Sequence, residues 1–367
     1  MNTLAMQNSS ARVLQLAANY FSTVAVFYLG YLFFTQYNDY FIRTFFAVWT
    51  PTLYERTDIV VSTELALRYL FLSYAVLLVP YYAYYRDKRS ASLIALAWLY
   101  GRIVGSRAQL EHVHKQAFLY LLLKAVFVPF IFSATISQLV GFNNALIKIV
   151  LASETLQAEP WMYVYMSYVH DLLMHGLFLL DVLPFVFGYL LDAPFLKNTI
   201  KSVDPTFSGW FFCLCCYQPF NYAAFAFFPR LSTESFNGLE LFGYPLTVAM
   251  DVILLVALAG YASASWSLGL KASNLTSRGV VRSGLYRWIR HPAYSLKLAA
   301  WWISVVPLIA GAYISGGNWF MIALGMSVWT MVYYFRAVTE ERHLRYTDAE
   351  YAEYCKVVSF RFIPNII

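Results

Sequence analysis

Long apolar runs separated by short polar segments dominate the chain. A helix needs about 20 mostly apolar residues to cross a bilayer. Eight segments approach this, at 14–36, 62–85, 116–140, 161–191, 209–228, 241–269, 296–314 and 319–339. A shorter apolar stretch at 91–104 is more typical of an interfacial or re-entrant helix. The pattern predicts an all-α fold, a polytopic transmembrane helical bundle of about eight spans.

The charges of the connecting loops alternate along the chain. Lys and Arg gather between spans two and three (for example Arg86), between four and five, between six and seven, and after span eight. The other loops hold few basic residues: Arg43, Arg56, Lys148 and Arg230. Because cytoplasmic loops carry the excess of Lys and Arg, both termini are predicted to be cytoplasmic. The expected location is a bacterial inner membrane or an endomembrane.

Composition agrees with this picture. Of the 367 residues, 60% are hydrophobic and only 13% are charged, whereas soluble domains carry about 25% charged residues. This excludes disorder and argues against a water-soluble enzyme. The net charge of +6 is explained by topology, so a lipid bilayer is the expected partner and nucleic acid is not. Cys213, Cys215 and Cys216 lack the C-x-x-C spacing of metal or redox motifs.

The fourth span contains four titratable residues, His170, Asp171, His175 and Asp181. Such groups are costly at membrane depth and face a protein interior or a water-filled cavity. His170, Asp171 and His175 are therefore candidate substrate-binding residues or part of a proton path. The alternative is a network of interhelical hydrogen bonds. The two histidines are five residues apart, not four as in zinc proteases, so no metal site is expected.

Candidate chemistry is concentrated after residue 270. Residues 278–294 read R-G-V-V-R-S-G-L-Y-R-W-I-R-H-P-A-Y and lead directly into span seven. Spans seven and eight form a hairpin across the uncharged turn at 315–318. Arg290, His291 and Tyr294 should therefore lie near Arg336 and Glu340 at the cytosolic face. The alternative interpretation is a belt of snorkelling basic residues in which Glu340 pairs with Arg336.

The R-H-P-x-Y motif at 290–294, with R-x-x-x-E-E at 336–341, resembles the isoprenylcysteine carboxyl methyltransferase and phospholipid methyltransferase family of integral membrane enzymes. The resemblance covers the last quarter to third of the chain. It implies an S-adenosylmethionine site. It assigns the following residues to the cofactor: Arg278, Gly279, Val280, Val281, Tyr286, His291, Pro292, Ala293, Tyr294 and Glu340.

The resemblance also implies that Arg336 contacts the methyl acceptor and that Arg290 orients substrate or cofactor, which makes both candidate catalytic residues. Two departures are visible. Leu296 stands where the family often has Gly, with Lys297 after it, and the usual F-G-x-E-Y appears as T-D-A-E-Y at 347–351. Residues 241–367 are thus expected to form the methyltransferase-like region, and 1–240 a transmembrane bundle that shapes the acceptor cavity.

These residue types suit methyl transfer. A carboxylate can bind the cofactor's amine or diol, cationic donors its carboxylate, and aromatic faces its sulfonium. The leading hypothesis is an S-adenosylmethionine-dependent methyltransferase acting on a membrane lipid or lipidated acceptor. The alternatives are an NADPH-dependent sterol-type reductase, in which the basic loop binds phosphate, and a non-enzymatic proton-coupled transporter. The methyl-accepting group, whether carboxylate, amine, thiol or hydroxyl, is left open.

Overall fold

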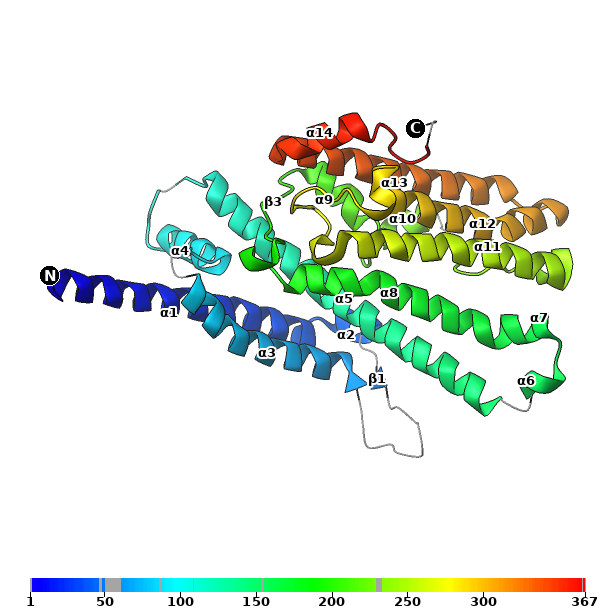
Figure 1. The fold of residues 1–367 in the computed structure, drawn as a ribbon, viewed down its shortest axis with the longest axis horizontal. Helices are drawn as coiled ribbons and strands as arrows, with labels where there is room; N and C mark the ends of the chain where they lie inside the picture. The colour runs from blue at the N-terminus through cyan, green and yellow to red at the C-terminus, as the bar shows by residue number, and fades with distance from the viewer. Residues whose placement is uncertain are drawn as a thin grey trace. The chain divides into compact units, whose positions relative to one another are not determined.

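The computed structural model describes residues 2–45, 48–49, 61–85, 88–107, 109–152, 155–228, 233–364 and 366. Arg56, Arg86 and Arg230, used above for orientation, lie outside them. Helices dominate the described part (Figure 1). Their bounds are α1 Asn2–Leu32, α2 Asp39–Phe45, α3 Thr63–Tyr84, α4 Ala91–Ile103, α5 His112–Leu151, α6 Thr155–Ala158, α7 Trp161–Val164, α8 His170–Leu190, α9 Phe207–Leu214, α10 Asn221–Phe227, α11 Leu239–Leu268, α12 Pro292–Ile314, α13 Trp319–Thr347 and α14 Ala349–Val357.

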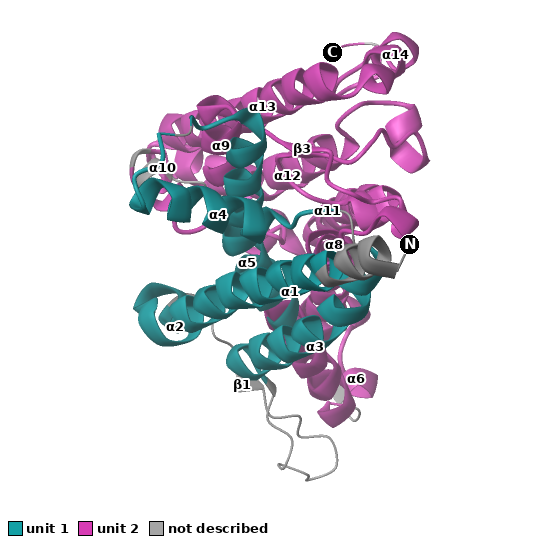
Figure 2. Cartoon of the chain, turned by 90° about the vertical axis from the view of Figure 1, so that its left-hand side faces the viewer, with its two compact units in different colours: residues 1–136 teal, residues 137–367 magenta. Residues whose placement is uncertain are grey.

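The strands of the described residues form two short antiparallel pairs. They are β1 (Val48–Trp49) with β2 (Val61–Ser62), and β3 (Ser202–Val203) with β4 (Thr276–Ser277). The chain divides into two compact units, residues 1–136 and 137–367, with the division inside α5 (Figure 2). The boundary expected at residue 240 therefore lies within the second unit.

In the first unit, α1 packs against α3 and α4. A buried Asn19 on α1 joins it to the start of α4: its amide donates to the carbonyl of Lys88 (2.8 Å) and its oxygen accepts from the backbone of Ser90 (2.8 Å). Ser90 in turn caps α4 by accepting from Leu93 N, which satisfies an otherwise unpaired helix-terminal amide. These bonds fix where the short apolar helix at 91–103 begins.

In the second unit, α11 packs between α8 and α12, and α12 packs on α13. Met174 of α8, Leu254 and Leu258 of α11, and Ala300 of α12 form one buried cluster. The end of α8 approaches the backbone after α11 so closely that a Cβ on Gly188 would lie 1.8 Å from the carbonyl oxygen of Ala272. Tight packing here holds the loop that follows α11 against the bundle.

Seven segments among the described residues are long and apolar enough to cross a membrane. They are Ala11–Tyr37, Thr63–Tyr84, His112–Leu151, Trp161–Leu190, Leu239–Lys271, Pro292–Ile314 and Trp319–Thr347. The protein is thus an all-α polytopic membrane bundle, as predicted. The cytoplasmic location of the termini stays a prediction.

The fifth expected span, 209–228, differs from the prediction. It folds as two short helices, α9 and α10, around Pro219, which lacks the amide that a continuous helix needs. The segment still runs along α13. Phe212 stacks on Phe335 (ring centroids 5.1 Å apart), and further along Trp329 Nε1 donates to the carbonyl of Phe228 (2.8 Å). The broken segment therefore packs along the middle of α13.

Candidate functional site

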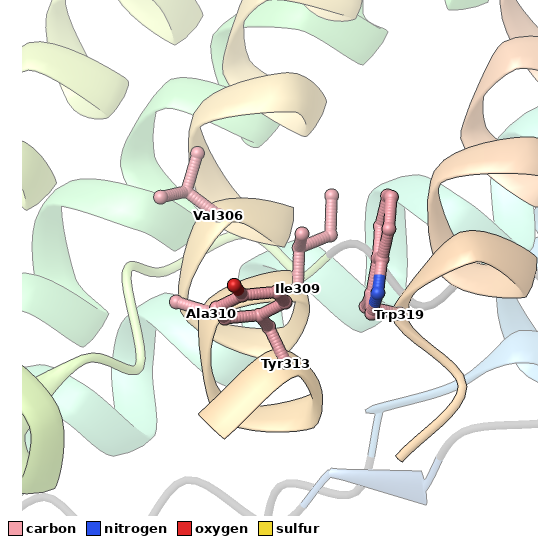
Figure 3. A pocket seen from close by; sticks show the side chains of 5 residues that line it. All are labelled: Val306, Ile309, Ala310, Tyr313 and Trp319. Atoms are coloured by element: carbon pink, nitrogen blue, oxygen red, sulfur yellow. The ribbon is translucent and has the colours of Figure 1, made fainter. Parts of the chain in front are cut away.

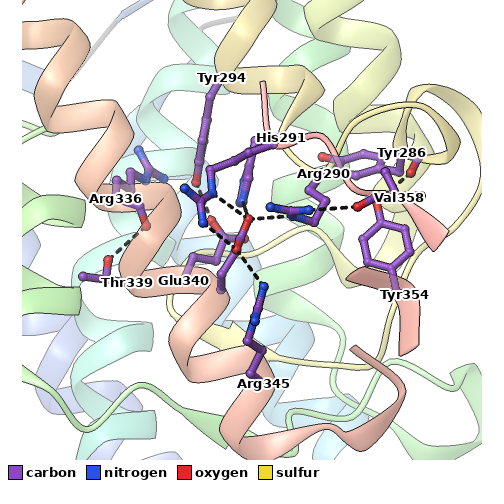
Figure 4. A network of polar contacts seen from close by, with 12 residues as sticks. Tyr286, Arg290, His291, Tyr294, Arg336, Thr339, Glu340, Arg345, Tyr354 and Val358 are labelled. Atoms are coloured by element: carbon purple, nitrogen blue, oxygen red, sulfur yellow. Dashed lines mark hydrogen bonds and ion pairs between the residues drawn. The ribbon is translucent and has the colours of Figure 1, made fainter. Parts of the chain in front are cut away.

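The loop leading into α12 and the end of α13 lie side by side, as the hairpin argument predicted (Figure 4). The start of α12 contacts two consecutive acidic residues on α13. Tyr294 donates its hydroxyl to Glu340 Oε2 (2.7 Å), and Arg290 Nε donates to Glu341 Oε1 (2.8 Å). The two regions therefore do share one site.

Glu341 is the centre of the ionic network. Its side chain is 3% exposed and receives Arg290, His291 (Nε2 to Oε1, 3.2 Å) and Arg361 (3.0 Å to each oxygen). Arg345, one helical turn on, approaches to 3.5 Å. Sequence reasoning named Glu340 and missed this role of its neighbour. The sequence shows the acidic pair at 340–341, but it does not show how the helix is rotated and therefore which carboxylate faces which partner.

Arg290 binds the C-terminal tail. Besides Glu341, it donates to the carbonyls of Val358 (2.8 Å) and Ser359 (2.6 Å). The tail also pairs with the backbone at the start of α12, where Arg290 N donates to Phe360 O and His291 N to Arg361 O. These bonds give Arg290 a positioning function, while the catalytic role predicted for it stays a prediction.

A cavity opens beside this network in the second unit. It contains about 730 Å³ of empty space, including its open mouth. Five tyrosines contribute to its wall, together with three basic side chains and one carboxylate. The lining residues are Phe185, Cys216, Tyr217, Tyr261, Ser265, Leu268, Ser273, Asn274, Tyr286, Arg290, His291, Ala293, Tyr294, Lys297, Tyr333, Arg336 and Glu340.

Arg336 is held firmly in the cavity wall. Its Nη2 donates to Asn274 Oδ1 (2.6 Å) and to the Tyr217 hydroxyl (3.3 Å). Its guanidinium also lies 5.1 Å from the ring centroid of Tyr294 and 5.7 Å from that of Tyr333. Planar stacking and forked hydrogen bonding are what distinguish Arg from Lys. The guanidinium is therefore held in a fixed orientation.

Seven of the residues assigned from the sequence line this cavity: Tyr286, Arg290, His291, Ala293, Tyr294, Arg336 and Glu340. The cofactor candidates Arg278, Gly279, Val280, Val281 and Pro292 are not among its lining residues. Arg278 is buried and donates to the carbonyl of Asn198 (2.8 Å). Val280 packs on the cluster of Tyr351, Tyr354 and Val358, and Pro292 is the first residue of α12.

The three candidates on the fourth span also lie away from the cavity. His170 Nδ1 is 2.7 Å from Asp251 Oδ2 on α11, and His175 Nδ1 is 2.9 Å from Gln138 Oε1 on α5. Asp171 is exposed. The two histidines thus make interhelical hydrogen bonds, which is the alternative interpretation of their sequence pattern. Asp251 also accepts from the Tyr165 hydroxyl and from Phe236 N.

A polar group that sequence reasoning did not assign to the site completes the cavity at membrane depth. Lys297 Nζ lies 3.5 Å from the Tyr261 hydroxyl and 5.4 Å from the ring centroid of Trp301. Behind it, Ser265 donates to the buried Asp181. The spacing in the sequence could have indicated this residue, because Lys297 follows Ala293 by four residues and so shares its helix face.

Outside the spans, burial affects two tyrosines near the site. It raises the pKa of Tyr286 and of Tyr354 above the usual range, so both hydroxyls stay protonated. The Tyr354 hydroxyl donates to the carbonyl of Tyr286 (2.6 Å) and fixes α14 against the loop. The hydrogen bond to Glu341 raises the pKa of Arg361, which therefore keeps its charge.

A different pocket occurs at the opposite end of α12. Val306, Ile309, Ala310, Tyr313 and Trp319 line about 590 Å³ of open space, and Figure 3 shows these side chains on the hairpin formed by α12 and α13. The lining is almost wholly apolar, so this pocket offers no group suited to catalysis.

These features define an integral membrane protein whose helical bundle encloses a polar, aromatic cavity where α12 begins and α13 ends. A family model described as a protein of unknown function, DUF1295, matches residues 221–358. The matched stretch runs from α10 to the end of α14 and contains most of the cavity wall. No curated protein and no solved structure matches the chain.

Proposed function

We propose that the protein is an S-adenosylmethionine-dependent methyltransferase that acts on a lipid or lipidated acceptor. The observation that carries the proposal is the cavity itself, which combines the Glu340 carboxylate, the fixed guanidinium of Arg336 and several tyrosine rings. On the loop-charge pattern, the cavity is placed at the cytosolic interface. A soluble cofactor then enters from the cytosol and an acceptor from the bilayer.

The residues present fit this cofactor group by group. Glu340 Oε2 accepts from Tyr294, and its other oxygen accepts from no described residue, so the carboxylate suits an ammonium or a ribose diol. His291 stacks on Tyr294 with an interplanar angle of 7°, and this pair offers a flat face to a ring or a sulfonium. Arg336 is left for the acceptor, because its guanidinium can bind an anionic group.

When bound, the cofactor supplies an electrophilic methyl group on a sulfonium. The chain contributes binding and alignment. Arg336 can hold an anionic acceptor, Glu340 and His291 can fix the cofactor, and the tyrosine wall excludes water. Near-attack alignment of two reactants is worth about 7–11 kcal/mol, so this chemistry needs no nucleophilic side chain.

Lys297 marks the acceptor end of the cavity in this proposal. It lies three residues after Tyr294, further along α12 and deeper in the span. Its ammonium lies 3.5 Å from the Tyr261 hydroxyl and lines the cavity. We assign it to the polar group of the acceptor because of this position, whereas Glu340, at the end of α13, belongs to the cofactor.

Ligand-dependent thermal stability of the detergent-purified protein tests the proposal. S-adenosylhomocysteine should raise the melting temperature of the wild type. Glu340→Gln should lose that protection. Glu353→Gln removes an exposed carboxylate on α14 that pairs with Lys356 (2.7 Å) and should keep it. A wild type that S-adenosylhomocysteine leaves unprotected contradicts the proposal.

The acceptor is identified by incubating membranes with methyl-labelled cofactor. Label extracted with lipid indicates a lipid acceptor, and base-labile label indicates a methyl ester. Transfer that survives Glu340→Gln at the wild-type rate would contradict the assignment of this carboxylate.

One observation favours a second candidate, an NADPH-dependent reductase. The Nζ atoms of Lys271 and Lys201 lie 3.3 Å and 3.7 Å from where a Cβ on Gly279 would sit. Two ammonium groups this close to a loop suit a nucleotide phosphate, although Lys201 also pairs with Asp348 (2.8 Å). Protection by NADPH but not by S-adenosylhomocysteine, weakened by Lys271→Gln, would favour this function.

A further inference from the structure

The first unit contains a cavity of its own, formed by α1, the start of α5 and one face of α4. It holds about 1110 Å³ of empty space, including its mouth. The lining residues are Gln15, Arg89, Leu93, Ile94, Ala97, Trp98, Gly101, Ser106, Val113 and His114. Arg89 carries the one formal charge among these residues, and no Asp or Glu lines the cavity. The lining therefore carries a net positive charge.

Two ring nitrogens at this cavity lack hydrogen-bond partners. Trp98 Nε1 and His114 Nδ1 are shielded from solvent and bond to no described residue. The indole N–H can only donate, and a buried polar group left unpaired costs about 1–3 kcal/mol. The rings are neighbours, with centroids 6.4 Å apart, and both line the cavity. The two unpaired nitrogens therefore belong to residues of the cavity wall.

The helix that carries Trp98 is suited to the membrane surface. Leu93, Ala97 and Gly101 face the cavity, whereas the large apolar side chains of Leu99, Tyr100 and Ile103 are exposed. A 13-residue helix is too short to span a bilayer, and exposed apolar residues on such a helix suit the headgroup boundary. The cavity therefore opens where lipid headgroups lie.

Further positive charge flanks the same helix. Arg89 lines the cavity just before α4, and Arg102 lies over the Trp98 ring at 5.8 Å from its centroid. Lys88 is exposed beside Arg89 without lining the cavity. Basic pockets between helices on the cytoplasmic side of a membrane suit anionic headgroups, and this loop belongs to the set predicted to be cytoplasmic.

We propose that this cavity binds the phosphate of an anionic membrane lipid. Phosphate oxygens are acceptors only, so they match the donors of Arg89, Gln15, Trp98 and His114. The acyl chains then lie along the apolar exposed residues of α4. The inference is independent of the proposed enzymatic function, because it rests on residues of the first unit alone.

The test uses the full-length protein in nanodiscs, with phosphatidylglycerol or phosphatidylcholine as the probe lipid. Phosphatidylglycerol should bind more tightly and raise the melting temperature more. Arg89→Gln and Trp98→Phe should each weaken its binding about tenfold, the size expected for losing one charge-assisted hydrogen bond. Trp98→Phe keeps a ring against Phe118 while removing the N–H. Lys88→Gln is the matched control and should bind as the wild type does.

Three results would overturn the proposal. Equal stabilisation by the two lipids would show that the cavity does not select an anion. Equal loss in Lys88→Gln and Arg89→Gln would indicate diffuse surface charge. Stabilisation by inorganic phosphate with no difference between the lipids would indicate a soluble phosphate ligand. If Trp98→Phe does not fold, the comparison of Arg89→Gln with Lys88→Gln decides the question.

Discussion

Replacing Glu341 by Gln should separate the structural from the ligand-binding function of the acidic pair on α13. Glu341 is buried and binds the buried guanidinium of Arg290 and that of Arg361. Removing one partner of a buried ion pair costs about 3–5 kcal/mol, since the other charge stays desolvated. Arg345 adds little, because its side chain is 52% exposed and exposed pairs contribute about 0–1 kcal/mol.

The expected result is a melting temperature lowered by about 6–20 °C, at about 2–4 °C per kcal/mol for a domain of this size. Glu340→Gln is the isosteric comparison. Its one hydrogen bond from a described residue comes from Tyr294, so the loss of stability should be about 0.5–1.5 kcal/mol. Differential scanning fluorimetry in detergent, with and without S-adenosylhomocysteine, measures both properties.

The two variants should therefore separate the stability of the protein from its stabilisation by ligand. Glu341→Gln should be less stable yet still gain stability from ligand while folded, whereas Glu340→Gln should be nearly as stable as wild type and gain none. A Glu341→Gln protein that melts within 2 °C of the wild type would refute the view that this carboxylate holds the tail and the start of α12 together.

Three further outcomes are expected. Arg336→Lys keeps the charge but loses forked bonding and stacking, so methyl transfer should fall about tenfold or more, and unchanged transfer would contradict the acceptor assignment. Lys297→Met should raise the acceptor KM and leave protection by S-adenosylhomocysteine intact; lost protection would place Lys297 at the cofactor instead. Gly188→Ala should destabilise the protein by at least about 1–3 kcal/mol, because the new methyl group would clash with the carbonyl of Ala272. Gly30→Ala is the control, since its methyl group meets nothing within 4 Å, and this variant should melt at or above the wild-type temperature. Equal melting temperatures of the two variants would contradict the close packing at Gly188.

The hydrophobic pattern predicted the bundle because lipid imposes one requirement on every span, a run of about 20 apolar residues. The same pattern failed at 209–228 for a physical reason. Hydropathy reports the preference of side chains for lipid, whereas helix continuity depends on backbone donors, which Pro219 interrupts. The broken segment packs against α13 instead, and no local pattern in the sequence indicates this contact.

At the site, the hairpin predicted which segments meet but not which side chain faces which partner. Consecutive helix positions are separated by about a quarter turn, so Glu340 and Glu341 necessarily point in different directions. The rotation of α13 decides between them, and buried tertiary contacts of Trp329 and Tyr333 set that rotation. Arg278 illustrates the same limit, because its burial against the carbonyl of Asn198 depends on a loop distant in sequence.

The acidic pair also couples the tail to the cavity. Glu341 holds Arg361 and His291 together, and His291 stacks on Tyr294, whose hydroxyl reaches Glu340. Phe362 lies against His291 with ring centroids 5.8 Å apart. The wall that presents Glu340 to the cavity is therefore complete only when residues 358–362 are docked against the start of α12. Ligand binding and docking of the tail should accordingly favour each other, because a ligand that needs the completed wall stabilises the docked state by mass action.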